Sequence, residues 1–338
     1  MSKGRSTVPE GAIVIEGVTK RFRDKTAVDQ LDLVVPTGSL CGFLGPNGAG
    51  KTTTIRMIMA IFLPDEGRVS VLGRPSAAES KDRIGYLPEE RGVYRKMRVG
   101  EFLSYIANLK GLGGACLSRK IDDWLERVAL PDARKKRCEE LSKGMQQKVQ
   151  FLASIIHDPE LIILDEPFSG LDPVNARLMR SLIEEMHRQG RTIIFSTHVL
   201  HSAEQLCTRI FMINKGRKIL DGSMDEIRSQ FDPKTIVVEP LSGEAPEAVR
   251  ASLASVPGVH AVAHAGERRT FEARLDAVAD AGAVMRSIVE RVPTRRVELR
   301  RATLEDVFVH LVDPGDSEDV LREMLGDPAA SSEVNADA

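Results

Sequence analysis

The sequence predicts an α/β protein whose main domain is built on a largely parallel sheet and is followed by a smaller α+β domain. Continuous apolar segments such as LIILD (161–165) and TIIFST (192–197) alternate with segments of helical spacing, which is typical of parallel strands covered by helices on both faces. Past about residue 232 the pattern changes to shorter strands and helices. The 338 residues provide enough chain for about two domains.

The composition is that of a globular chain with a packed core and little net charge. The hydrophobic content is 42% and the formal net charge is −2, so bulk charge gives no reason to expect nucleic acid as a partner. The four cysteines show no C-x-x-C spacing, which argues against a zinc site or a disulfide framework and favours a reducing compartment. No apolar run approaches the roughly 18 residues of a membrane-spanning helix, so any membrane role should be peripheral.

The first half of the main domain is expected to alternate between strands and helices. Strands are expected at residues 12–19 and 31–36, and residues 34–62 then pass from a strand through a glycine-rich turn into a helix. Two helices are expected within residues 101–130, on either side of the breaker KGLGG.

The second half of this domain continues the alternation. A helix should begin with Ser142 as its N-cap and continue until Pro159 stops it. Residues 175–190 should form the helix between the two buried strands. Residues 209–222 are expected to form a hairpin that turns at Asn214-Lys215-Gly216.

The C-terminal part reads as a β-α-β-β-α-β unit. That order of elements suggests a small ferredoxin-like domain. Its expected strands are 234–239, 259–265, 269–275 and 294–300, and its expected helices are 246–256 and 277–292. The tail from Asp313 to Ala338 holds eight acidic residues and a single basic one, Arg322, and is expected to be disordered.

A phosphate-binding loop is expected at the start of the helix that follows residue 50. Residues 45–52, GPNGAGKT, satisfy G-x-x-x-x-G-K-[ST] after a strand and at the start of a helix. Glycines there allow successive backbone N–H groups to surround a phosphate chain. Lys51 would reach the β and γ phosphates, and the Thr52 hydroxyl would bind Mg²⁺. The alternative is a glycine loop that only caps the helix.

Three polar side chains follow buried strands. Asp165 and Glu166 come at the end of LIILD, at the strand ends where open α/β sheets bind ligands. Asp165 could hold the magnesium, and Glu166 could orient the attacking water or accept its proton; alternatively, the pair only caps the next helix. His198 follows TIIFST, should emerge at the same sheet edge and could hydrogen-bond a γ-phosphate.

Together these motifs resemble those of the ATP-binding cassette (ABC) ATPases. GPNGAGKTT (45–53) resembles the Walker A loop, LIILDEP (161–167) Walker B, SGLD (169–172) the D-loop and STH (196–198) the switch histidine. LSKGMQQK (141–148) occupies the place of the family's LSGGQ signature. The resemblance covers residues 12 to about 225, and it is specific because four motifs follow one another in the family's order.

The resemblance implies a set of nucleotide contacts. In this family two cassettes meet head to tail, so Ser142 and Gly144 of one would face the γ-phosphate bound to the other, at a helix N-terminus whose free N–H groups suit an anion. Asp172 would be the D-loop aspartate. Phe22 is the candidate to stack on adenine, unless it is an ordinary half-buried side chain. The implied Walker A contacts are Gly45, Pro46, Asn47, Gly48, Ala49, Gly50, Lys51, Thr52 and Thr53.

The sequence departs from the family pattern at two places. Lys143 and Met145 replace the third and fifth signature residues, whereas Ser142 and Gly144 are kept, so binding in trans should survive. Glu89 stands where the family usually has a glutamine that touches Mg²⁺. A carboxylate is a better ligand than an amide for a hard cation, so Glu89 either binds the metal or is solvated without a role.

A further resemblance is to the motor subunits of bacterial sodium and drug exporters whose membrane permease is a separate chain. It rests on the acidic LPEERG loop (87–92), the signature and the ending TLEDVFVHL (303–311). It implies an ATPase that dimerises around two ATP–Mg²⁺, lies on the cytoplasmic face of the cell membrane as a peripheral protein, and drives a transmembrane permease.

The implied organisation has three parts. An ABC ATPase nucleotide-binding domain spans residues 1–231, with a helical subdomain at about 89–158. A ferredoxin-like accessory domain spans 232–312, and an acidic tail spans 313–338.

Two other functions are weighed against this one. A soluble ABC-type ATPase that acts on nucleic acid or ribosomes usually carries two cassettes or a long coiled-coil insertion, whereas this chain has one cassette and no sustained heptads. A GTPase is disfavoured because INKGR (213–217) has Arg217 where a guanine-reading motif needs aspartate.

Overall fold

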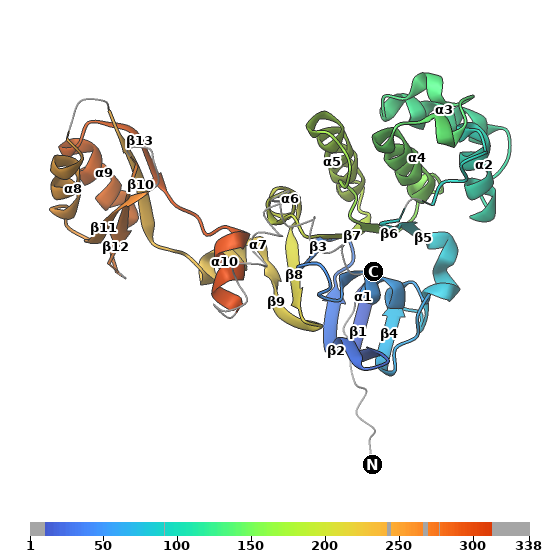
Figure 1. Ribbon diagram of the computed structural model, residues 1–338, viewed down its shortest axis with the longest axis horizontal. Helices are drawn as coiled ribbons and strands as arrows, with labels where there is room; N and C mark the ends of the chain where they lie inside the picture. Colours follow the sequence, from blue (N-terminus) through green and yellow to red (C-terminus); the bar gives the residue numbers. More distant parts are fainter. Residues whose placement is uncertain (1–10, 91, 242–244, 266–269, 277, 313–338) are drawn as a thin grey trace, which may run out of the picture. The chain divides into compact units, whose positions relative to one another are not determined.

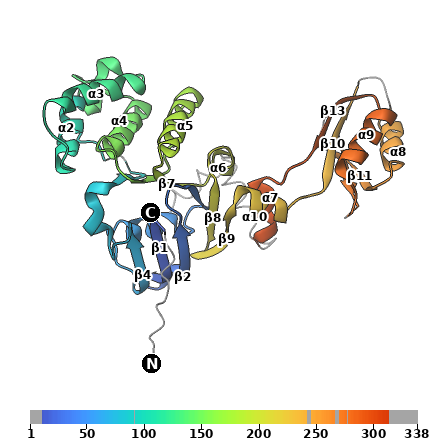
Figure 2. The same ribbon diagram turned by 180° about the vertical axis from the view of Figure 1, so that it is seen from behind.

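The computed structural model describes residues 11–312 apart from 91, 242–244, 266–269 and 277, and it divides into two compact units (Figures 1 and 2). The first unit runs up to Met224 and also takes in Leu311 and Val312, while the second spans Asp225–His310. The acidic tail expected at 313–338 lies outside the described residues. None of the helices in the described part of the chain combines the length and apolar character needed to span a bilayer.

A six-stranded sheet forms the centre of the first unit. The order is β5-β6-β7-β3-β8-β9, parallel except for β9, which pairs antiparallel with β8. Every residue of β3, β6 and β7 is buried, which explains their continuous apolar sequences. The strands are β3 (Leu40–Leu44), β5 (Ile84–Leu87), β6 (Leu161–Asp165), β7 (Thr192–Thr197), β8 (Arg209–Asn214) and β9 (Arg217–Ser223).

The hairpin between β8 and β9 turns where the sequence predicts. Asn214 pairs with Arg217, and the two residues between them, Lys215 and Gly216, have φ angles of 47° and 80°. Two consecutive positive φ angles are typical of a type I′ turn, whose twist suits a two-residue hairpin. The mixed sheet expected from the sequence is therefore confirmed.

A second, three-stranded antiparallel sheet of order β2-β1-β4 shares its core with the helix α1 (Lys51–Ile58). Figure 1 shows the three strands, in blue, beside α1. The sequence did not predict β4, because EGRVSV has only two apolar residues, Val69 and Val71, which is too short an alternation to indicate a strand. The strands are β1 (Ile13–Phe22), β2 (Lys25–Val35) and β4 (Glu66–Val71).

The helices of the first unit include a group of three, α2, α3 and α4, that lie together in both views (Figures 1 and 2). As predicted, α4 begins after Ser142, whose hydroxyl accepts the N–H of Met145 at 3.3 Å. It ends at Ile155 and does not continue to Pro159, because Asp158 turns the chain with a φ of 55°. The helices are α2 (Val99–Leu109), α3 (Cys116–Arg127), α4 (Lys143–Ile155), α5 (Pro173–Arg188) and α6 (Leu200–Leu206), with 3₁₀ segments at Ala77–Arg83, Pro131–Ala133 and Cys138–Glu140.

The second unit has the predicted ferredoxin-like arrangement. Its four strands form an antiparallel sheet of order β11-β12-β10-β13, and its core holds buried side chains of the sheet together with those of α8 and α9. The elements are β10 (Thr235–Pro240), α8 (Pro246–Ala254), β11 (Val259–Ala265), β12 (Thr270–Leu275), α9 (Ala281–Arg291) and β13 (Thr294–Leu299). The helices α7 (Met224–Gln230) and α10 (Leu304–Leu311) precede and follow them.

A half-buried histidine follows α4 and packs against β5. His157 Nε2 lies 3.1 Å from the carbonyl oxygen of Ile84, and its Nδ1 is buried without a hydrogen-bond partner in the described part of the chain. Burial, with a further contribution from nearby Lys110, lowers the pKa of His157 from 6.5 to about 4. The neutral ring is therefore the form that suits the folded state.

We expect the His157→Gln variant to lose less stability than the parent when the pH falls. The pKa of His157 is lower in the folded state than in the unfolded state. Its contribution to the free energy of unfolding is therefore fully present above about pH 6.5 and is lost as the pH falls toward 4. Glutamine keeps a donor for the Ile84 carbonyl but does not titrate. After allowance for solvent screening, the parent should lose about 1–2 kcal/mol more than the variant over this range. Urea unfolding at pH 7 and pH 4.5 measures the difference, and equal acid slopes would contradict the role of His157.

Candidate active site

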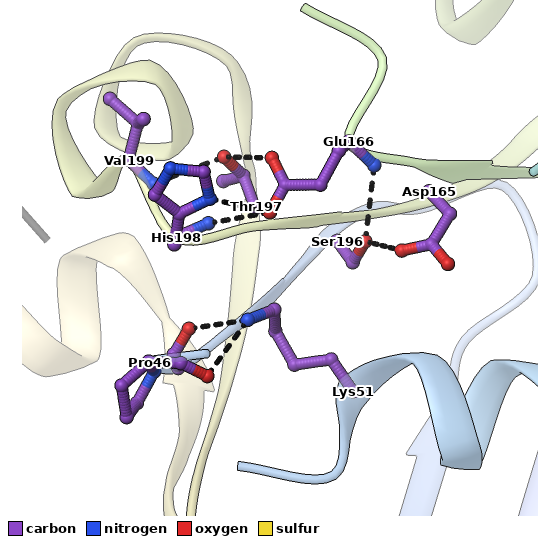
Figure 3. A network of polar contacts seen from close by, with 9 residues as sticks. Pro46, Lys51, Asp165, Glu166, Ser196, Thr197, His198 and Val199 are labelled. Atoms are coloured by element: carbon purple, nitrogen blue, oxygen red, sulfur yellow. Dashed lines mark hydrogen bonds and ion pairs between the residues drawn. The ribbon is translucent and has the colours of Figure 1, made fainter. Parts of the chain in front are cut away.

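Three parallel neighbours, β6, β7 and β3, end at one edge of the central sheet. The loop of residues 45–50 follows β3, Asp165 ends β6, and His198 comes directly after β7. Parallel pairing therefore brings the three predicted motifs together (Figure 3), at the carboxyl ends where open α/β sheets bind ligands.

The loop of residues 45–50, before α1, packs tightly against neighbouring segments. A side chain is not tolerated at Gly45, because a Cβ there would lie 2.2 Å from the Ile213 carbonyl oxygen. Gly50 caps α1 with a φ of 111° and offers no side-chain cap, and the N-terminus of such a helix suits an anionic ligand. Lys51 is 7% exposed, and its Nζ donates to the carbonyl oxygens of Gly45 at 2.6 Å and Pro46 at 3.0 Å (Figure 3).

A cavity of about 500 Å³ opens at this loop. Its lining brings the loop together with Glu166 and with Phe22 and Glu89, the predicted adenine and Mg²⁺ contacts. Phe22 is 41% exposed and makes an edge contact with Phe62. The sequence did not point to Lys25 and Ala27, which also line the cavity. The lining residues are Phe22, Lys25, Ala27, Asn47, Gly48, Gly50, Lys51, Thr52, Thr53, Glu89 and Glu166.

Asp165 is fully buried and only partly satisfied. Its Oδ1 accepts the Ser196 hydroxyl (Figure 3), and its Oδ2 is buried without a hydrogen-bond partner in the described residues. Desolvation raises the pKa of Asp165, and the nearby charges of Glu89 and Glu166 raise it further. A buried carboxylate with an open oxygen, near the Thr52 hydroxyl, is a donor set that a hard divalent cation would complete.

Glu166 is held in a strained conformation. Its φ of 48° lies in the left-handed region, which costs a non-glycine residue on the order of 1 kcal/mol. Its Oε1 accepts the backbone N–H of His198 at 3.0 Å and the ring Nδ1–H at 2.8 Å, and its Oε2 accepts the Thr197 hydroxyl at 3.2 Å (Figure 3). These bonds fix the carboxylate against the end of β7, facing the cavity.

The signature and D-loop residues do not line this cavity. Ser142 is exposed and Gly144 half-buried at the N-terminus of α4. Asp172 is the N-cap of α5, where its Oδ1 accepts the N–H groups of Val174 at 3.0 Å and Asn175 at 2.9 Å. Within one chain these residues thus lie apart from the loop that the sequence predicts to bind phosphate.

Buried polar side chains of α4 contact three functional segments, and the sequence reasoning missed them. Gln147 donates to the Pro167 carbonyl oxygen at 3.2 Å, and Lys148 donates to Asn175 Oδ1 at 3.0 Å. Gln150 donates to the carbonyl oxygens of residues 88 and 90, at 3.3 and 3.1 Å. These side chains are 3%, 4% and 5% exposed. The sequence did not reveal their burial, because glutamine and lysine usually lie on the surface of a helix.

Comparison with known proteins places these motifs in a family. Residues 28–169 match the family model described as ABC transporter. Residues 222–312 match the model described as ATP-binding protein DrrA1-3-like, C-terminal domain.

Three relatives extend the match over most of the chain. An uncharacterized ABC transporter ATP-binding protein, YhaQ of Bacillus subtilis, is 45% identical over 67% of this chain and 76% of its own. The daunorubicin resistance ATP-binding protein DrrA3 of Streptomyces coeruleorubidus is 34% identical over 89% of this chain and 95% of its own. The Nod factor export ATP-binding protein I of Paraburkholderia xenovorans is 34% identical over 90% of this chain and 98% of its own.

A solved structure supports the fold. The ATP-binding subunit of an ABC transporter superposes with a TM-score of 0.61 at 30% identity, covering 65% of this chain and 93% of its own. The predicted resemblance to the motor subunits of bacterial exporters is thereby confirmed, and membership of this family implies a membrane permease as partner. The chain therefore belongs to the ABC transporter ATP-binding subunits, and it is an ATPase of that family with a DrrA-like C-terminal domain.

Proposed function

We propose that this chain is the motor of an exporter: it forms a homodimer around two ATP–Mg²⁺ at the cytoplasmic face of the membrane and drives a separate transmembrane permease there. The observation that carries the proposal is the division of the nucleotide machinery over two surfaces. The phosphate loop and Glu166 share one cavity, whereas Ser142 and Asp172 lie outside it. A second copy, placed head to tail, would supply the missing groups to each cavity.

The donor set beside the loop fits magnesium. Asp165 offers a buried oxygen without a partner in the described residues, and Thr52 and Glu89 line the neighbouring cavity. Bound there, Mg²⁺ would neutralise charge on the β and γ phosphates of ATP. Because Glu89 raises the pKa of Asp165 by its negative charge, the two carboxylates gain from a shared cation.

The remaining chemistry belongs to the chain's own residues. Lys51 now donates to two loop carbonyl oxygens and would exchange them for phosphate oxygens when ATP enters. Glu166 would orient the attacking water and accept its proton. Its hydrogen bonds from His198 and Thr197 leave it little freedom, so the carboxylate is positioned before the substrate arrives.

ATP would drive closure by preferring the closed dimer. Moving an equilibrium from mostly open to mostly closed takes about 5.5 kcal/mol of differential binding, so each of two sites would supply about half. The N-terminus of α4, with Ser142 as its cap, would offer N–H groups to the γ-phosphate on the other chain. Hydrolysis removes that bridge and allows reopening.

The surface after β5 is the proposed contact for the permease. Tyr94 is 52% exposed, and its ring meets that of Tyr105, itself 41% exposed, edge to face at 5.7 Å. Leu109, at the end of α2, is 65% exposed. These exposed aromatic side chains follow Glu89 in the chain, and Glu89 lines the ATP cavity. A permease bound to them would therefore be close to the segment that contacts the nucleotide. Relatives named for daunorubicin resistance and Nod factor export support export as the direction.

The proposed trans contact predicts different outcomes at two signature positions. Ser142→Arg places a bulky side chain where a phosphate must approach and removes the α4 cap, so ATP turnover should fall roughly a hundredfold. Met145→Gln keeps the cap and should stay within about threefold of the parent. Steady-state phosphate release, with thermal unfolding as the folding control, measures both. Comparable losses in the two variants would contradict the trans contact.

The metal role of Glu89 predicts a shift in magnesium dependence. In Glu89→Gln, the Mg²⁺ concentration for half-maximal turnover should rise roughly threefold to tenfold, because an amide is a weaker ligand for a hard cation. The measurement is a Mg²⁺ titration at saturating ATP, with the permease present. Unchanged Mg²⁺ dependence and turnover would show that Glu89 does not hold the metal.

Affinity purification from native membranes tests the function as a whole. A tagged Glu166→Gln chain, with ATP and Mg²⁺ to hold the closed dimer, should recover a polytopic membrane protein in about equal amount from detergent extracts. The matched control, Glu166→Gln with Tyr94→Glu, should recover several-fold less. Ribosomes or nucleic acid in place of a membrane protein would instead establish a soluble ABC-type ATPase.

A further inference from the structure

One of the buried polar side chains of α4 carries a charge. Lys148 is 4% exposed, and Asn175 Oδ1, at 3.0 Å, is the hydrogen-bond acceptor that the described residues give its ammonium. Gln147 and Gln150, its neighbours on α4, are buried but neutral. Burying Lys148 therefore costs more desolvation free energy than burying either glutamine.

The contact of Lys148 leads directly to the D-loop aspartate. Asn175 Nδ2 donates to Asp172 Oδ2 at 2.5 Å. The other oxygen of Asp172 accepts the N–H groups of Val174 and Asn175 and so begins α5. A chain of hydrogen bonds thus runs from the signature helix through Asn175 to Asp172.

Stability of the fold does not account for this buried charge. Desolvation lowers the pKa of Lys148, and the nearby negative charge of Asp172 opposes that shift. A buried ammonium with one neutral acceptor is unfavourable relative to an apolar side chain of similar volume. Methionine would fill the same space without this desolvation penalty, and glutamine would keep a donor for Asn175.

We propose that Lys148 is a positioning residue for ATP hydrolysis, whose buried ammonium holds Asp172 and the D-loop, residues 169–172, in a fixed position between Glu166 and the signature helix. This inference rests on the proposed function, because the D-loop and signature act on nucleotide only in the dimer.

The D-loop contacts both halves of the proposed site. The N–H of Ser169 donates to the Glu166 carbonyl oxygen at 3.1 Å. At its other end, Leu171 lies beside the signature, since a Cβ added to Gly144 would meet Leu171 Cδ2 at 3.5 Å. A displacement of Asp172 would therefore be transmitted to the catalytic carboxylate and to the N-terminus of α4 together, and errors of about 1 Å in such positions reduce rates by up to ~100-fold.

Three substitutions in the full-length chain separate charge from volume and hydrogen bonding. Lys148→Met removes charge and donor, Lys148→Gln keeps a donor, and Lys148→Arg keeps the charge. Amide hydrogen exchange of the peptide covering 169–176 reports the D-loop directly. Steady-state kinetics give kcat and KM for ATP, and thermal unfolding gives Tm.

Lys148→Met and Lys148→Gln should speed exchange in residues 169–176 and lower kcat roughly tenfold, with KM within about twofold and Tm unchanged or higher. Lys148→Arg should restore slow exchange and most of kcat. Parent-like exchange and kcat in Lys148→Gln would overturn the proposal. So would a fall in Tm with faster exchange throughout α4, which indicates a purely structural role.

A separate measurement keeps the two proposals distinguishable. ATP-dependent dimerisation of the Glu166→Gln chain, followed by size-exclusion chromatography, tests the proposed function without reference to Lys148. If that chain stays monomeric, the dimer proposal fails. The exchange of residues 169–176 in the Lys148 variants still decides whether the ammonium positions the D-loop.

Discussion

The parallel pairing of β6 with β7 and of β7 with β3 is the constraint on which the rest of the site depends. It places Asp165 opposite Ser196 and Leu44 opposite Thr197, so the phosphate loop, the acidic pair and His198 emerge at one edge. Parallel strands require crossover connections: α5 lies in the crossover from β6 to β7, and α4 lies in the one that joins β5 to its parallel neighbour β6. The same pairing that assembles the phosphate cavity thus also determines where the signature and D-loop stand.

Sequence reasoning succeeded where one physical signal dominated. The buried strands β6 and β7 were recognisable because both faces are covered, and the α4 start because serine is a good N-cap. β5 was missed because a four-residue apolar run carries no period. The ferredoxin-like order of elements was predictable, because each of its four strands and two helices is a separate short segment with the periodicity of its type.

The candidate site was predictable as a set of residues but not as a geometry. Motif spacing could identify Glu166, yet its left-handed φ and its bonds to Thr197 and His198 arise from packing at the sheet edge. Lys148 gave no signal, because a lysine that follows two glutamines in a helix is typical of a solvated face. Its ammonium contacts Asn175 of α5, 27 residues away in sequence, and local patterns do not contain that information.

Three groups of the candidate site depart from the rules of stable folding. Asp165 keeps a buried oxygen without a partner in the described residues, Glu166 adopts a strained backbone, and Lys148 buries an ammonium against an amide. Each departure lowers stability by itself, and two of them lie at the end of one strand while the third contacts the helix that follows. All three groups belong to the nucleotide machinery described above, so they are the groups whose cost a chemical role would justify, and the buried apolar core supplies the stability that they reduce.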